Sequence, residues 1–107
     1  MVAFHGLHEK KDFSGQSFRL ATLDGLMFKM CDFSGADLRG ASIRGTHFAG
    51  CDLRGVDFSG ADLTEAVFSF VMTHDPEYGL CDVTGATWTG ANLKRVTTDR
   101  VVGWPKD

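Results

Sequence analysis

The side chains of this chain that could do chemistry are first of all its cysteines and histidines. Thiolate and imidazole groups can bind zinc together, and a cysteine beside a histidine can form a nucleophile and base pair. His47 stands four residues before Cys51, and Cys31 stands twenty residues before it, but the chain has no CxxC pair. Whether these groups can converge depends on the architecture that carries them.

That architecture is set by a repeat of five residues. The third residue of each unit is large and apolar. The residue two places before it is mostly small from Ala21 onward, and a glycine closes most units. The unit therefore reads small, polar, large apolar, polar, glycine. The large apolar column is unbroken over twelve units: Phe13, Phe18, Leu23, Phe28, Phe33, Leu38, Ile43, Phe48, Leu53, Phe58, Leu63 and Phe68.

Alternation within the unit is the period of a β-strand, and glycine adopts the positive φ that a tight turn needs. Each unit is therefore predicted to be one short side followed by one corner. If the corners turn through about 90°, four units close a square coil, and successive coils stack at about 4.8 Å. The period predicts an all-β solenoid with a narrow, filled interior.

The segments "GADLRGASIRG", "GVDFSGADL" and "GANL" resemble the pentapeptide-repeat proteins, and the resemblance covers about Lys11 to Arg95. It implies their fold, a right-handed quadrilateral β-helix (a β-solenoid), here of about four to five coils with a short capping segment at each end. In this view the 107 residues form a single domain. We expect the following parts: an N-terminal cap at 1–10, regular repeats at 11–70, degenerate repeats or a loop at 71–80, repeats at 81–95 and a C-terminal cap at 96–107.

The caps are expected because a bare coil exposes unpaired strand edges. Phe4 and Leu7 could cover one end, and Val101, Val102 and Trp104 the other. Each end could equally mediate an end-to-end homodimer.

The repeat fades at 71–80, "VMTHDPEYGL", and then resumes in phase. Two accounts are open. The coil continues in distorted form with Tyr78 near the core, or the segment loops out and returns on another face. A period of twenty gives an aromatic interior column, Phe28, Phe48, Phe68 and Trp88, which favours the first account.

The register also decides whether the cysteines and histidines can come together in one site. Cys31 and Cys51 face inward on adjacent coils, whereas His47 faces outward, so they do not converge and are not expected to bind metal or to form a catalytic pair. A filled prism also offers little of the concavity that an active site needs. We therefore expect a non-enzymatic protein with no catalytic, cofactor-binding or metal-binding residues.

The composition limits the kinds of partner that are expected. The net charge is −3, whereas surfaces that bind nucleic acids or membranes usually carry a basic excess, so neither is expected as a direct partner. No signal peptide or membrane span is visible in the sequence, and the odd number of cysteines favours a reducing compartment. These features predict a cytoplasmic protein. We also expect the protein to be of bacterial type.

The surface pattern gives the candidate binding residues. On the side that holds the aromatic column, Met27, Met30, Val67 and Phe70 are expected to point outward together, as a partner surface, a dimer contact or the seat of a terminal tail. A secondary acidic surface is expected from five outward aspartates: Asp32, Asp37, Asp52, Asp57 and Asp62.

We expect a rigid protein–protein interaction module whose partner the sequence does not name. The family resemblance implies an alternative, because some members mimic DNA, bind topoisomerases such as gyrase and protect against toxins or antibiotics. The glycine rule also breaks in places, where turns of another type are expected. These exceptions are Leu20, Met30, Glu65, Phe70 and Arg95.

Overall fold

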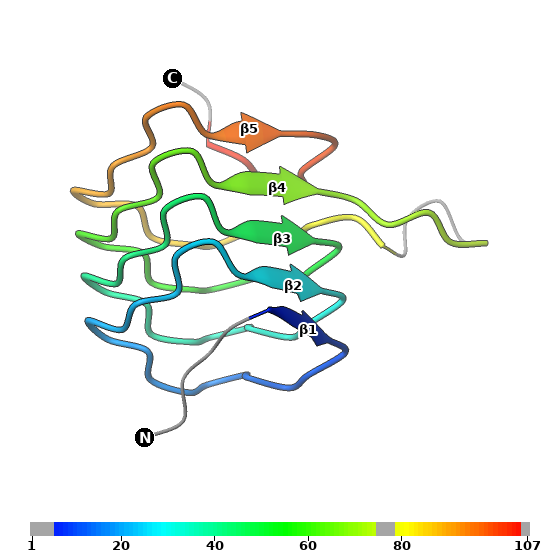
Figure 1. Ribbon diagram of the computed structural model, residues 1–107, viewed down its shortest axis with the longest axis horizontal. Coiled ribbons are helices and arrows are strands. Elements are labelled where there is room, and N and C mark those ends of the chain that lie inside the picture. Colours follow the sequence, from blue (N-terminus) through cyan, green and yellow to red (C-terminus); the bar gives the residue numbers. More distant parts are fainter. Residues whose placement is uncertain (1–5, 75–78, 106–107) are drawn as a thin grey trace.

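The computed structural model describes residues 6–74 and 79–105, and one parallel sheet runs through all of its coils (Figure 1). The sheet has the order β1-β2-β3-β4-β5, so each strand pairs with the next one along the chain. Its strands are β1 (Leu7–Glu9), β2 (Met27–Lys29), β3 (His47–Ala49), β4 (Val67–Ser69) and β5 (Thr97–Thr98). Within the described residues there is no helix that could cross a membrane.

The strands form one side of a square coil, which we call the strand face. The other three sides are held by parallel bridges between residues twenty positions apart, such as Asp32 with Asp52, Asp37 with Asp57, and Ser42 with Asp62. We name these sides the Asp32 face, the Asp37 face and the Ser42 face. The fold is thus the expected all-β, right-handed quadrilateral solenoid.

The coils are joined by backbone hydrogen bonds that repeat from coil to coil. The N–H of Phe33 donates to the carbonyl oxygen of Asp52 at 2.7 Å, and the N–H of Asp52 donates back to Cys31 at 3.0 Å. At the corner, the N–H of Ala36 donates to the carbonyl oxygen of Phe33 at 2.9 Å, and Gly35 has a φ of 68°. Each unit is therefore one side and one left-handed corner, as the repeat predicts.

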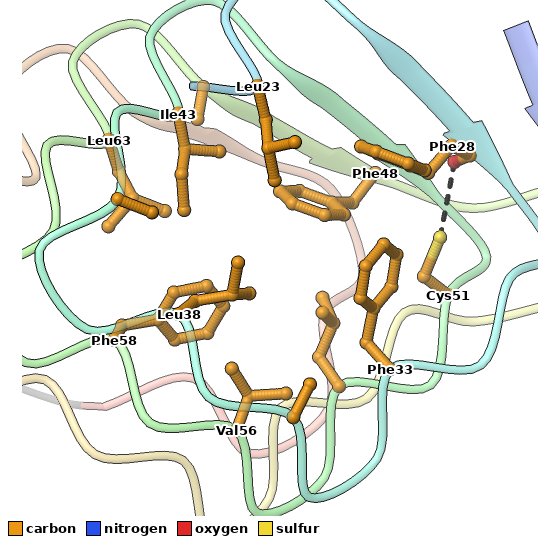
Figure 2. Packing of buried hydrophobic residues seen from close by; sticks show 14 of the residues in the cluster. Leu23, Phe28, Phe33, Leu38, Ile43, Phe48, Cys51, Val56, Phe58 and Leu63 are labelled. Atoms are coloured by element: carbon orange, nitrogen blue, oxygen red, sulfur yellow. Dashed lines mark hydrogen bonds between the residues drawn. The ribbon is translucent and has the colours of Figure 1, made fainter. Parts of the chain in front are cut away.

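The large apolar column fills the interior. Phe33, Phe48 and Phe58 are fully buried, and Figure 2 shows them pointing inward from different sides with Leu23, Ile43 and Leu63 along another wall. Phenylalanine rings stack from coil to coil, with centroids 5.6 Å apart for Phe28 and Phe48 and 5.2 Å for Phe48 and Phe68. This stacking makes the interior one continuous apolar column.

The segment after β4 is an insertion, and the account that carried the coil through it is wrong. Asp52 pairs with Asp82, thirty residues on, whereas every earlier bridge joins residues twenty apart. The chain leaves the coil at the end of β4, and residues 71–74 extend away from it (Figure 1). The N–H of Val71 donates to the carbonyl oxygen of Gly79 at 2.8 Å and closes the neck of this insertion. Pro76 and Tyr78 lie outside the described residues.

The insertion shifts every later residue by two sides of the square. Trp88 therefore stacks on Phe58, with ring centroids 4.6 Å apart, and does not continue the Phe68 column. Val83 likewise lies on the Asp32 face and not above Leu63, whose side is continued by Leu93. The predicted aromatic column therefore ends at Phe68, whose paired residue in the next coil is Thr98 of β5.

The expectation of other turn types at the exceptions to the glycine rule is wrong at four of the five positions. Leu20, Met30, Glu65 and Arg95 have φ between 56° and 62°, in the same left-handed region as the glycines. Phe70 is the fifth, and there the chain leaves the coil for the insertion.

The two ends are closed differently from what was expected. Leu7 does not cover the N-terminal end, because it lies in β1 with 57% of its surface exposed; Phe4 lies outside the described residues. At the other end, the Trp104 ring packs 5.2 Å from Phe68 and 5.0 Å from Trp88, so it does cover the interior there.

Two glycine substitutions test how the insertion is seated. Gly45 and Gly50 share a φ near 64°, so alanine at either site costs about 1 kcal/mol of left-handed strain. A Cβ at Gly45 meets nothing within 4 Å, whereas one at Gly50 would lie 2.9 Å from the backbone oxygen of Gly79 and 2.7 Å from Met30 Sδ. We expect Gly50→Ala to lower the free energy of unfolding by about 1–2 kcal/mol more than Gly45→Ala in urea titrations. Equal losses would contradict the seating of the insertion neck over Gly50.

Candidate interaction surface

The strand face carries two of the four residues predicted to form a partner surface. Met27 and Val67 lie in one outward column of the sheet, each paired in register with His47 between them. All three are half-buried, and His47 Nε2 lies 2.6 Å from Ser69 Oγ. This part of the surface is carried by three paired strands, β2, β3 and β4.

The other two residues, Met30 and Phe70, lie at the corner beside the strand face. The insertion leaves and rejoins the coil at this corner, which we call the root of the insertion. Met30 leans over Gly50, and the Arg100 guanidinium lies 4.4 Å from the centroid of the Phe70 ring. The predicted surface is therefore two sites, one on the sheet and one at this corner.

Two shallow grooves flank the root of the insertion, and both are lined by Leu80. The first, of about 230 Å³, is lined by Met30, Gly50, Asp52, Arg54, Gly79, Leu80, Asp82 and Val102. The second, of about 200 Å³, is lined by Phe70, Val71, Met72, Thr73, His74, Leu80 and Arg100. Met30 and Phe70 thus each line one groove, and Met72 has 82% of its surface exposed.

Leu80 is the residue of this site that the sequence did not single out. It occupies a glycine position of the repeat, so it could have been found as a further exception to the glycine rule. The insertion brings it back above Gly50, where the coil would otherwise continue from Phe70.

The five aspartates of the predicted acidic surface are spread over three sides of the square. Asp32 and Asp52 lie on the Asp32 face, Asp37 and Asp57 on the next, and Asp62 on the Ser42 face. On the Asp32 face, the column also includes Asp12 and Asp82, which makes four carboxylates in register.

These aspartates also hold the backbone. Asp37 Oδ1 accepts the N–H of Arg39 at 3.0 Å, and Asp57 Oδ1 accepts the N–H of Ser59 at 3.0 Å. Such turns over two residues are a standard use of aspartate, so the polar column has a structural role beyond being solvated. The Ser59 hydroxyl also donates to Asp57 and lowers its pKa.

Arginines neutralise part of the acidic charge. The Arg39 guanidinium binds both carboxylate oxygens of Asp37, at 2.9 and 2.8 Å, and holds the pKa of that carboxyl at about 2. Arg54 binds Asp52 in the same way, at 2.9 and 2.7 Å. Both arginines are at least half exposed, so these pairs add little stability, but they reduce the negative potential.

The cysteines lie in the interior, where the sequence placed Cys31 and Cys51. Cys51 Sγ donates to the carbonyl oxygen of Phe28 at 3.1 Å (Figure 2), and burial raises the pKa of the Cys51 thiol. Burial also raises the pKa of Cys81 to about 12. His47 lies on the outer surface of the sheet and does not meet them. Across the described residues, no three His, Cys, Asp or Glu side chains are arranged to hold a metal ion.

The family model described as pentapeptide repeats matches residues 31–69, with eight copies. Residues 31–69 are a run of pentapeptide repeats. The same side-and-corner unit extends from this run to the coils on either side of it, through the register described above.

Several solved structures are similar to the chain. A pentapeptide-repeat protein from the thylakoid lumen of Arabidopsis thaliana is 26% identical, with a TM-score of 0.42, over 85% of this chain and 60% of its own. QnrB1, a plasmid-mediated fluoroquinolone resistance protein, is 20% identical, with a TM-score of 0.39, over 89% of this chain and 83% of its own. HetL from the cyanobacterium Nostoc, involved in regulating heterocyst differentiation, is 24% identical, with a TM-score of 0.32, over 85% and 44%. No curated protein matches the chain.

The carboxylates make stability depend on pH in a defined direction. A carboxyl whose pKa is lowered by folding stabilises the native state above its unfolded pKa of about 3.9, and this contribution is lost as the pH falls through the native pKa. Because Asp37 titrates near 2, Asp37→Asn should lower the melting temperature at pH 7 and have no effect below about pH 2. Thermal unfolding followed by circular dichroism from pH 2 to 7 measures this. Melting curves that stay equally separated over the whole range would contradict it.

Proposed function

We propose that this protein is a rigid, non-enzymatic protein–protein interaction module, and that its partner contacts the root of the insertion. The observation that carries the proposal is the pair of grooves on either side of Leu80, lined by Met30 on one side and Phe70 on the other. Elsewhere the solenoid repeats the same side and corner.

The scaffold favours such a role. The root is held by the coil ladder, since Met30 donates its N–H to Ala49 and Val71 donates its N–H to Gly79, both at 2.8 Å. A surface that is ordered before binding loses little conformational entropy in the complex, so even modest contacts contribute to affinity. Met72, mostly exposed beside the groove of Phe70, adds an apolar group of the flexible kind that adapts to a partner.

A photo-reactive amino acid placed at Met72 tests this proposal in native cell extract. We expect a discrete cross-linked product from Met72 and none from the matched exposed position Asn92 on the Ser42 face, because only the former adjoins the grooves. The double variant Met30→Ser and Phe70→Ser should remove the product, at a cost of about 1–2 kcal/mol in stability.

The strand face provides the control. Met27→Ser and Val67→Ser change the other two residues of the predicted surface and should leave the product in place. If this pair removes the product and the root pair does not, the contact lies on the sheet and the proposal is wrong about its place. Equal products from Met72 and Asn92 would reject a specific contact at the root.

A second candidate is the protection of a topoisomerase by DNA mimicry, which one observation favours. Asp12, Asp32, Asp52 and Asp82 stack in register on one face, at the spacing of successive coils. Among the described residues only Asp52 of these four is in an ion pair, with Arg54. A gyrase supercoiling assay with and without the protein tests it, and unchanged supercoiling and unchanged quinolone inhibition would reject it.

A further inference from the structure

The two grooves at the root of the insertion differ in charge. One is lined by the carboxylates of Asp52 and Asp82 and by the guanidinium of Arg54. The other, which we call the Phe70 groove, is lined by Arg100, and no Asp or Glu of the described chain lines it. The Phe70 groove is therefore locally cationic, although the net charge of the whole chain is −3.

The guanidinium of Arg100 is positioned by the ring that gives the groove its name. It lies 4.4 Å from the centroid of Phe70, a distance at which the ring attracts the cation. The N–H of Asp99 donates to the carbonyl oxygen of Phe68 at 2.9 Å and ties the chain before Arg100 to the coil below. The Arg100 side chain nevertheless stays 66% exposed, so a ligand can reach it from solvent.

The hydrogen-bond donors of Arg100 are not taken up by a carboxylate of its own turn, as those of two other arginines are. Arg39 and Arg54 each bind both oxygens of the aspartate two residues earlier, at 2.7 to 2.9 Å. Arg100 has Thr98 in that position. Within the described residues, its one ion pair joins Nε to Asp99 Oδ1 at 3.9 Å, which is too long for a hydrogen bond. Its N–H groups are therefore free to bind a further carboxylate in bidentate fashion.

Apolar side chains adjoin this cation. Phe70, Val71 and Leu80 line the groove and are half-buried, and Met72 lines it with 82% of its surface exposed. A groove with apolar walls and a single fixed charge orients its ligand by the charge and gains affinity from the walls. A ligand that suits it therefore combines a carboxylate with a neighbouring apolar group.

We infer that the partner binds the Phe70 groove through an acidic peptide segment, in which a carboxylate stands next to a large apolar side chain. This rests on the function proposed above, in which the partner contacts the root. The carboxylate binds Arg100, and the apolar side chain packs between Phe70 and Leu80. A basic segment is disfavoured here, because Arg100 would repel it. An Asp or Glu side chain and the C-terminal carboxylate of a chain offer the same chemistry.

Three short peptides test this with the full chain labelled with ¹⁵N and observed by NMR. The acidic probe is acetyl-Leu-Phe-Glu-amide, its neutral match is acetyl-Leu-Phe-Gln-amide, and acetyl-Leu-Phe with a free C-terminus carries the terminal carboxylate. We expect the acidic probe to shift the amide signals of Val71, Leu80 and Arg100, with a Kd of about 1 mM. The neutral peptide should bind about tenfold more weakly or less. The tighter of the two acids identifies the source of the carboxylate.

Two arginines provide a matched pair of variants. Arg100 and Arg95 both stand at corners with φ of 56°, are 66% and 61% exposed, and have one long ion pair each, with Asp99 and Glu65. Arg100→Gln should weaken the acidic probe about tenfold, whereas Arg95→Gln should leave its Kd unchanged. Arg100→Lys keeps the charge but loses the planar fork, so its Kd should lie between those of the wild type and Arg100→Gln. Circular dichroism confirms the fold of each variant.

Equal binding of the Glu and Gln peptides would overturn the inference, as would no binding of either acid or an equal loss in Arg100→Gln and Arg95→Gln. Signals that shift around Arg54 and Asp82 instead would place the site in the wrong groove. The photo-cross-link from Met72 separates this from the proposed function. A product that survives Arg100→Gln keeps the partner at the root and rejects its acidic segment. Binding of the acidic probe without any cross-linked product would reject the partner and retain the carboxylate site.

Discussion

The left-handed corner that closes each regular unit of five residues is the constraint on which the rest of this structure depends. Glycine adopts it without steric cost, but Lys10, Leu20, Met30, Glu65, Arg95 and Arg100 adopt it too. Each such residue costs about 1 kcal/mol or more. The ladder above and below holds them, as at Met30, whose N–H donates to Ala49 in the next coil. The corner is therefore dictated by the stack and only made easier by glycine.

This constraint explains what could be predicted from the sequence. The period of five identifies which side chains point inward, so Phe33, Phe48 and Cys51 could be assigned to the interior without coordinates. It does not identify the side of the square, because that depends on the number of residues since the previous coil. An insertion of ten residues preserves the period and rotates every later residue by two sides. Trp88 thus keeps its inward direction but stacks on Phe58 instead of Phe68.

The insertion also explains why the predicted partner surface is divided into two sites. Met30 and Phe70 were expected to join Met27 and Val67 because all four belong to neighbouring columns of regular coils. The chain leaves the coil at Phe70 and returns through Leu80, and the two grooves at this corner are both lined by Leu80. Their lining depends on the side of the square at which the chain re-enters the coil. Leu80 is recognisable as an exception to the glycine rule, but the period of five is unchanged across the insertion and does not reveal that side.

The residues that deviate from the repeat carry the information about association, and their chemistry differs between the two ends. A solenoid is nearly one-dimensional, so any coil can in principle accept another on its edge. Lys11 and Gln16 replace small apolar residues at one end and make that edge costly to cover, whereas Ala86, Ala91 and Val96 keep the apolar pattern at the other. Covering Lys11 with another coil would take its charge out of water, so stacking on the N-terminal edge of the described chain is disfavoured.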